Sequence, residues 1–146
     1  MIHNILVKSH SGLRWMILAA LLVAIVRFAS AATARKKVRN MGPYALTALV
    51  LTHIQVLFGL WLYVISPKVV FEAASMKNSV QRFFLVEHIS LMILAAALMT
   101  IGYVTTKKQI NTPYGGKKLL FYYLISLFLI LLAIPWPFRG FGTAWF

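Results

Sequence analysis

The sequence predicts an all-α membrane protein, built as an up-down-up-down bundle of four transmembrane helices. Of its 146 residues, 61% are hydrophobic and 12% are charged, which is more apolar surface than a soluble domain of this size can bury. The apolar residues form four long runs, at about 5–32, 43–65, 83–104 and 119–136. Each run is near or above the ~20 residues that a helix needs to cross a bilayer, and none alternates like a barrel strand. We expect one domain over residues 1–146.

The first run has features of a cleaved signal peptide. Lys8 and Arg14 precede an apolar stretch, and small residues follow it at 29–34. Arg27 interrupts the order of regions that a signal peptide has. We therefore interpret this run as the first spanning helix.

Proline and glycine predict the ends of the other helices. Pro43 suits the first position of the second helix, and Pro67 favours the end of that helix. The connection 68–82 mixes apolar and polar residues and could form an interfacial helix. The turn residues at 112–116 precede the fourth helix, and the prolines at 135 and 137 end it. Because the connections are short, we expect antiparallel neighbours.

Several small residues lie inside the apolar runs. Such residues let neighbouring helices approach closely in a membrane, and we expect packing to be their only role. They are Ala19, Ala20, Gly59, Ala95, Ala96, Ala97 and Gly102.

The formal net charge is +13, with 15 Lys and Arg residues against two acidic ones. Two connections hold many of the basic residues: Arg35, Lys36, Lys37 and Arg39 after the first run, and Lys107, Lys108, Lys117 and Lys118 before the fourth. The positive-inside rule places both connections in the cytoplasm and both termini outside. The pattern favours contact with anionic lipids of the bilayer, and we expect no nucleic-acid partner. The chain has no cysteine, which excludes disulfides, thiolate metal sites and covalent haem attachment.

Three histidines, His10, His53 and His88, lie inside runs that are otherwise apolar. An ionisable residue at membrane depth indicates a functional site. His10 and His88 each lie about five residues into a run, or ~7–8 Å from the outer helix ends. The first and third helices run in the same direction, and as diagonal neighbours their axes are roughly 11–14 Å apart. Two imidazoles and an iron can bridge such a gap, so we predict that His10 and His88 are the axial ligands of a haem.

Charged residues near the outer helix ends are candidates for binding the haem propionates. Arg14 lies four residues after His10 and hence on the same helix face, and an arginine fork suits a carboxylate. The alternative for Arg14 is that it extends toward the lipid headgroups. Arg139 and Arg82 are further candidates. Glu87 could orient a histidine, pair with an arginine or be exposed at the interface.

His53 lies about 10 Å deeper than the other two histidines. Three roles stay open for it: it replaces His10 as a ligand, it hydrogen-bonds a quinone, or it is a core histidine. Met92 is either a soft metal ligand or a packing residue, and we expect His3 to be solvated outside the bilayer. The motifs of hydrolytic catalysis are absent from the sequence, so we predict no catalytic residues.

The chain resembles a family of small bacterial four-helix membrane proteins of the cytochrome b-like type. The matching segments are 10–15 (HSGLRW), 52–60 (THIQVLFGL), 82–88 (RFFLVEH) and 133–136 (AIPW). The resemblance implies the bacterial inner membrane, a b-type haem held non-covalently by histidines, and a role in electron transfer. A weaker likeness is to one half of the haem A synthase bundle, although the longer pattern of that enzyme is missing.

Three functions therefore stay open. The first is electron transfer between a quinone or a membrane dehydrogenase and an acceptor on the outer side. The second is a haem-free structural or assembly subunit of a respiratory complex. The third is a membrane enzyme that uses haem or a metal on a lipid-soluble substrate.

Overall fold

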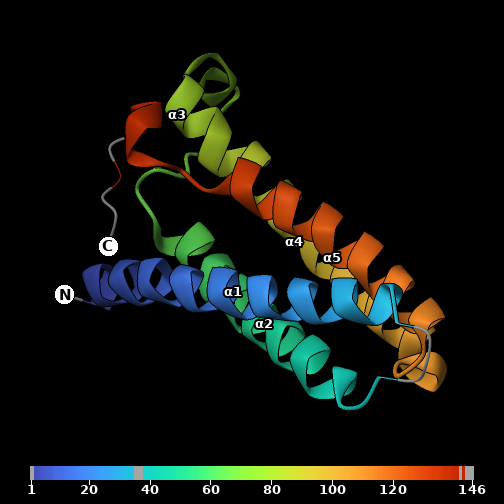
Figure 1. Cartoon of the computed structure of the whole chain (residues 1–146). Coiled ribbons are helices and arrows are strands. Elements are labelled where there is room, and N and C mark those ends of the chain that lie inside the picture. Colours follow the sequence, from blue (N-terminus) through green and yellow to red (C-terminus); the bar gives the residue numbers. More distant parts are fainter. Residues whose placement is uncertain (1, 35–37, 142, 144–146) are drawn as a thin grey trace.

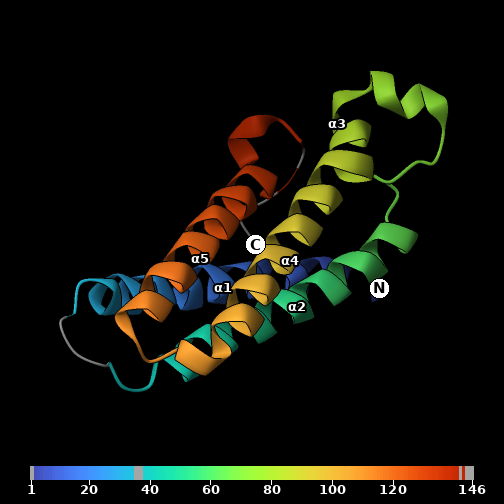
Figure 2. The same cartoon turned by 90° about the vertical axis from the view of Figure 1, so that its right-hand side faces the viewer.

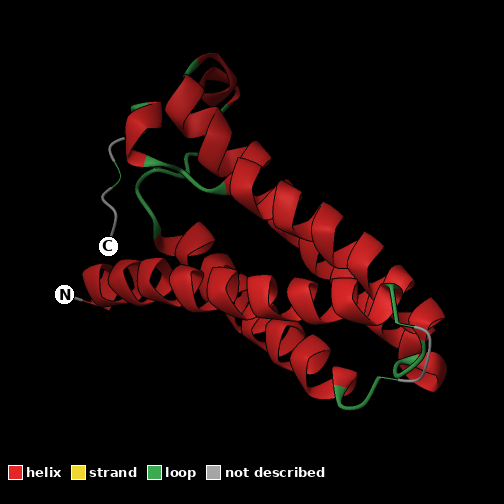
Figure 3. Cartoon of the chain, viewed as in Figure 1, coloured by secondary structure: helices red, strands yellow, loops and turns green. Residues whose placement is uncertain are grey.

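A computed structural model describes residues 2–34, 38–141 and 143 of the chain. These residues form four long helices and no strand. Helices α1 (Ile2–Ala32), α2 (Met41–Ile65) and α5 (Pro113–Ala133) are each long and apolar enough to cross a membrane. So is the continuous helical segment Ser79–Gln109. The predicted all-α fold with four membrane-length helices is confirmed (Figure 3).

The third span, Ser79–Gln109, is made of four consecutive helical pieces. They are α3 (Ser79–Arg82), the π-helix η2 (Phe83–Glu87), α4 (His88–Thr106) and the 3₁₀ turn η3 (Lys107–Gln109). Two further 3₁₀ turns, η1 (Ala73–Lys77) and η4 (Pro137–Arg139), lie outside the long helices. The connection 68–82, in which the sequence favours an interfacial helix, thus holds the short turn η1 and, at its end, α3 of the third span.

The order of the helices around the bundle makes α1 and α4 diagonal partners. Helix α1 packs against α2 and α5, and α4 packs against α5 and α2. The two views of the ribbon agree with this arrangement (Figures 1 and 2). It is the diagonal relation that the sequence predicts for the first and third spans.

The helices form two pairs, α1/α2 and α4/α5, which converge at one end of the bundle and diverge at the other (Figure 1). The C-terminal end of α1, the N-terminal end of α2 and the turn at 107–112 lie at the convergent end. The N-terminal end of α1 and the C-terminal end of α5 lie at the divergent end. Small residues explain the close approach. A Cβ added to Gly102 of α4 would lie 2.7 Å from Cβ of Tyr122, and one on Gly116 would lie 2.9 Å from Cβ of Ala31. Helix surfaces without side chains at these points let the backbones approach closely.

Two helix ends differ from the predictions because of capping. The side chain of Asn78 accepts hydrogen bonds from the backbone N–H of Val80 and Gln81, so the third span begins at 79 instead of 83. The hydroxyl of Thr112 accepts one from Gly115 N–H at 3.0 Å, and Pro113 occupies the first turn of α5. Residues 113–116, predicted to be part of a turn, are therefore helical.

We predict that Gly102→Ala destabilises the bundle by about 1–3 kcal/mol, because the added methyl group overpacks the contact with Tyr122. Thermal unfolding in detergent measures the change. Gly12→Ala is the matched control, since a Cβ at position 12 meets nothing within 4 Å. Equal midpoints for the two variants would show that this contact does not hold α4 against α5.

Candidate functional site

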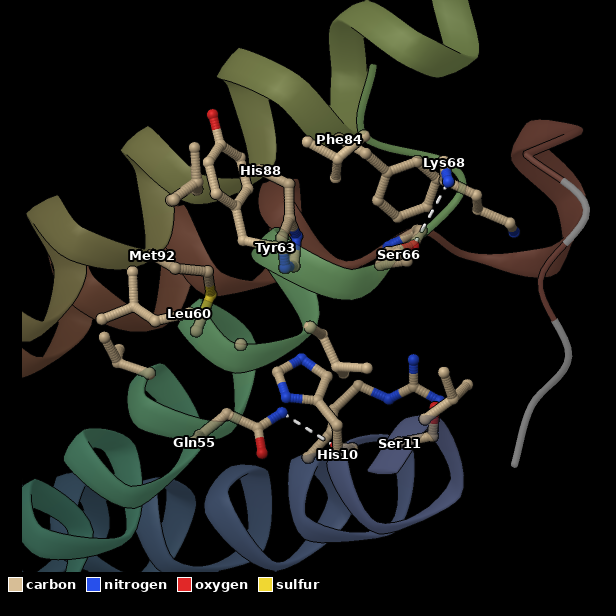
Figure 4. Close-up of a pocket in the computed structure, with 18 of the residues that line it drawn as sticks. His10, Ser11, Gln55, Leu60, Tyr63, Ser66, Lys68, Phe84, His88 and Met92 are labelled. Carbon is tan, nitrogen blue, oxygen red and sulfur yellow. Dashed lines mark hydrogen bonds between the residues drawn. The ribbon is translucent and has the colours of Figure 1, made fainter. Parts of the chain in front are cut away.

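A cavity lies between the diverging helix pairs, and all four long helices contribute to its lining (Figure 4). Counted together with the open solvent at its mouth, its space is about 1340 Å³. Most of the lining is apolar. The lining includes His10 and Arg14 of α1, Gln55, Gly59 and Tyr63 of α2, His88 and Met92 of the third span, and Lys68 of the loop after α2.

The rings of His10 and His88 meet in this cavity. Their centres are 6.3 Å apart, and their planes make an angle of 67°. His10 lies eight residues after the start of α1, and His88 lies nine residues after Ser79. At 1.5 Å per residue the two positions have nearly the same depth, although each lies about one turn further from its helix start than the sequence indicates. Figure 4 shows the two side chains pointing toward one another.

His88 is held firmly by its surroundings. Its Nδ1 lies 2.7 Å from the carbonyl oxygen of Ala133. A carbonyl only accepts, so Nδ1 is the protonated nitrogen, and Nε2 keeps its lone pair. The rings of Phe83 and Phe84 pack against the imidazole, with centres at 5.8 and 6.2 Å. This arrangement of a histidine is typical of metal ligands, whose second nitrogen usually donates to a carbonyl or a carboxylate.

The π-helix η2 directly precedes His88 and sets the direction of its side chain. The backbone N–H of His88 donates to the carbonyl of Phe83, five residues back. The hydroxyl of Tyr63 donates to the carbonyl of Leu85, inside η2, at 2.9 Å. Helix α2 is thereby tied to the turn that presents His88. Single π-helical turns of this kind are frequent at functional sites.

His10 is held differently. Its Nδ1 is buried and has no hydrogen-bond partner among the described residues. Its Cε1 would lie 3.2 Å from a Cβ placed on Gly59, so the ring occupies the space that the glycine leaves on α2. The amide of Gln55 donates to the backbone carbonyl of His10 at 2.9 Å, which fixes the helix but not the ring.

The charged side chains in the described lining of the cavity, Arg14 and Lys68, are both cationic. Arg14 is 9% exposed, and its guanidinium lies over the ring of Trp15, 5.4 Å from its centre. Lys68 donates from Nζ to the carbonyl of Phe141 at 3.1 Å, and burial lowers the pKa of this lysine. Neither of the two acidic residues of the chain lines the cavity. An anionic group is therefore favoured beside Arg14.

The structure does not bring His53 to this cavity. His53 is exposed on the outer surface of the bundle, beside Thr100 of α4. Its Nδ1 lies 2.8 Å from the carbonyl of Leu49, and its Nε2 lies 3.3 Å from the hydroxyl of Thr100. Both ring nitrogens thus have partners from the protein.

Arg139 and Arg82, the candidate arginines at the outer helix ends, also interact with groups outside the cavity. Arg139 is exposed, donates to the carbonyl of Leu132 at 2.8 Å, and lies over the rings of Phe83 and Phe141. Arg82 forms an ion pair with Glu87 at 2.9 Å, one of the roles left open for that carboxylate. None of these three charged residues lines the cavity.

Several lining residues were missed from the sequence, among them His3, Gln55, Gly59 and Tyr63. His3, expected in solvent, has its Nε2 buried without a partner in the described part of the chain. The spacing of these residues along the sequence could have indicated that they line one site. His3, His10 and Arg14 recur at intervals of seven and four, and the α2 residues at intervals of four, so each set shares one helix face. Met92 lines the cavity as well.

No family model, curated protein or solved structure matches this chain. The cytochrome b-like resemblance of the sequence therefore stays an expectation.

Proposed function

We propose that the chain is a membrane cytochrome that holds one b-type haem, non-covalently, between His10 and His88. The separation of the two rings is the observation that carries the proposal. Metal–imidazole bonds are about 2.0–2.1 Å long, so two imidazoles on opposite sides of one metal have ring centres about 6 Å apart. The separation in the structure is 6.3 Å.

The composition of the site favours haem over a bare metal ion. Among the described residues there is no group of three or more His, Cys, Asp or Glu side chains that could hold an ion. Two imidazoles suffice only where a macrocycle supplies the remaining ligands. The apolar lining suits a porphyrin, and Arg14 is placed to pair with a propionate.

The bound haem would supply a one-electron carrier. The protein would hold it by the two histidines, keep their imidazoles neutral in an apolar setting, and fix the ring of His88 through the carbonyl of Ala133. We propose transfer of electrons between a quinone or a membrane dehydrogenase and an acceptor on the outer side. The dehydrogenase, or another subunit of a respiratory complex, would be the protein partner of this chain.

For topology, we propose the bacterial inner membrane with both termini outside. Of the two basic clusters the structure describes Arg39, Lys107, Lys108, Lys117 and Lys118, which lie in or next to the connections at the convergent end of the bundle. Arg35, Lys36 and Lys37 lie outside the described residues. The positive-inside rule assigns that end to the cytoplasm. The divergent end, where the cavity lies, then faces the outer side.

The visible spectrum of protein purified after expression with ample haem tests the function. We predict a Soret band and a low-spin spectrum. His10→Ala and His88→Ala should each abolish the low-spin spectrum, because an axial ligand is lost. His53→Ala is the matched control and should keep the spectrum, since His53 lies outside the cavity. Wild-type protein without a Soret band would support the haem-free structural role.

Cysteine labelling tests the topology, because the chain has no native cysteine. Lys77 and Lys108 are both exposed, near opposite ends of the third span. An impermeant thiol reagent added to whole cells should label Lys77→Cys and leave Lys108→Cys unlabelled. The reverse pattern would invert the proposed orientation.

A further inference from the structure

The two histidines differ in how the protein supports them, and the difference has a functional consequence if the proposed haem is bound. Nδ1 of His88 is bonded to the Ala133 carbonyl at 2.7 Å. Nδ1 of His10 is buried and has no such partner among the described residues. A hydrogen bond from the second nitrogen fixes the ring and raises its basicity as a metal ligand. His88 is therefore the stronger and His10 the weaker ligand.

The packing around the two rings also indicates that His88 is the stronger ligand and His10 the weaker one. The ring of His88 lies against Phe83 and Phe84, which immediately precede it on the third span. The ring of His10 faces Gly59, which has no side chain to confine it. The first turns of α1 are also loosely covered, with Ile5 58% exposed. A ring with few contacts has more freedom to turn away from its ligand position.

We propose that His10 is an exchangeable ligand and that the site binds a small neutral diatomic molecule, of the class of carbon monoxide, nitric oxide and dioxygen, on the His10 side of the haem. This inference rests on the proposed function. Binding is a ligand exchange, in which the bond from iron to His10 breaks, a bond to the diatomic molecule forms, and no electron is transferred. The apolar cavity beside His10 gives such a molecule room and access from the membrane.

Carbon monoxide is the probe for the first test. The reduced wild-type protein, titrated with carbon monoxide, should give a carbon monoxide complex in its visible spectrum. Gly59→Ala should bind the gas about tenfold more tightly, because the added methyl group displaces only the ring of His10. Gly12→Ala, on α1 itself but with open space around its Cβ, should bind like the wild type. If the visible spectra of the reduced, haem-loaded wild-type and Gly59→Ala proteins both stay unchanged under saturating carbon monoxide, the proposal is overturned.

Removal of each histidine identifies which one is exchanged. His10→Ala should keep its haem on His88, as a high-spin species that binds carbon monoxide without competition from a sixth ligand. His88→Ala should lose the haem. The opposite result, with haem retained only in His88→Ala, would reverse the assignment. A wild-type protein that takes up no haem would instead contradict the proposed function itself, so the two failures are distinguishable.

Discussion

The bundle depends on a gradient in side-chain size along its axis. At the convergent end, glycine and alanine let α5 approach α1 and α4 so closely that a Cβ on Gly102 or Gly116 would collide with its neighbour. At the divergent end, bulky or polar side chains such as Tyr63, Phe84 and Met92 face the space between the pairs. In a membrane the hydrophobic effect does not drive helices together, so van der Waals packing decides where they touch. The cavity lies where the backbones of the two helix pairs are further apart, and side chains such as Tyr63 still connect the pairs there.

This gradient also determines which residues form the site. The helices are rigid, so a side chain reaches the cavity only if its residue lies in the divergent half and on an inner face. His10 and His88 satisfy both conditions. His53 satisfies neither, because it lies deeper and on the outer surface, where Leu49 and Thr100 bond its ring.

Much of the fold could be predicted from the sequence, since run length and hydrophobicity determine a spanning helix almost alone. The shared depth of His10 and His88 could also be predicted, because a constant rise per residue converts sequence position into depth. The direction of His53 could not, since it depends on how α2 is rotated against its neighbours. Helix α5 begins earlier than the sequence predicts, because Gly115 and Gly116 indicate a turn, whereas the cap at Thr112 makes them helical. The contact of Gly59 with His10 was missed because glycine was assigned to packing alone.

The burial of Arg14 in the cavity has a cost in free energy. A buried arginine is expensive in a membrane, and Arg14 is 9% exposed in a cavity whose described lining has no carboxylate. Glu87 forms its ion pair with Arg82, outside the cavity. A ligand that brings its own negative charge to the cavity would compensate this cost, and haem does so through its propionates.

Electron paramagnetic resonance of the oxidised, haem-loaded protein tests whether His10 and His88 hold the haem, because the signal reports the axial ligands of the iron. We expect a low-spin signal of two imidazole ligands in the wild type, unchanged in His53→Ala. A low-spin signal that persists in the double variant His10→Ala/His88→Ala would contradict it, since the iron would then be held elsewhere in the chain.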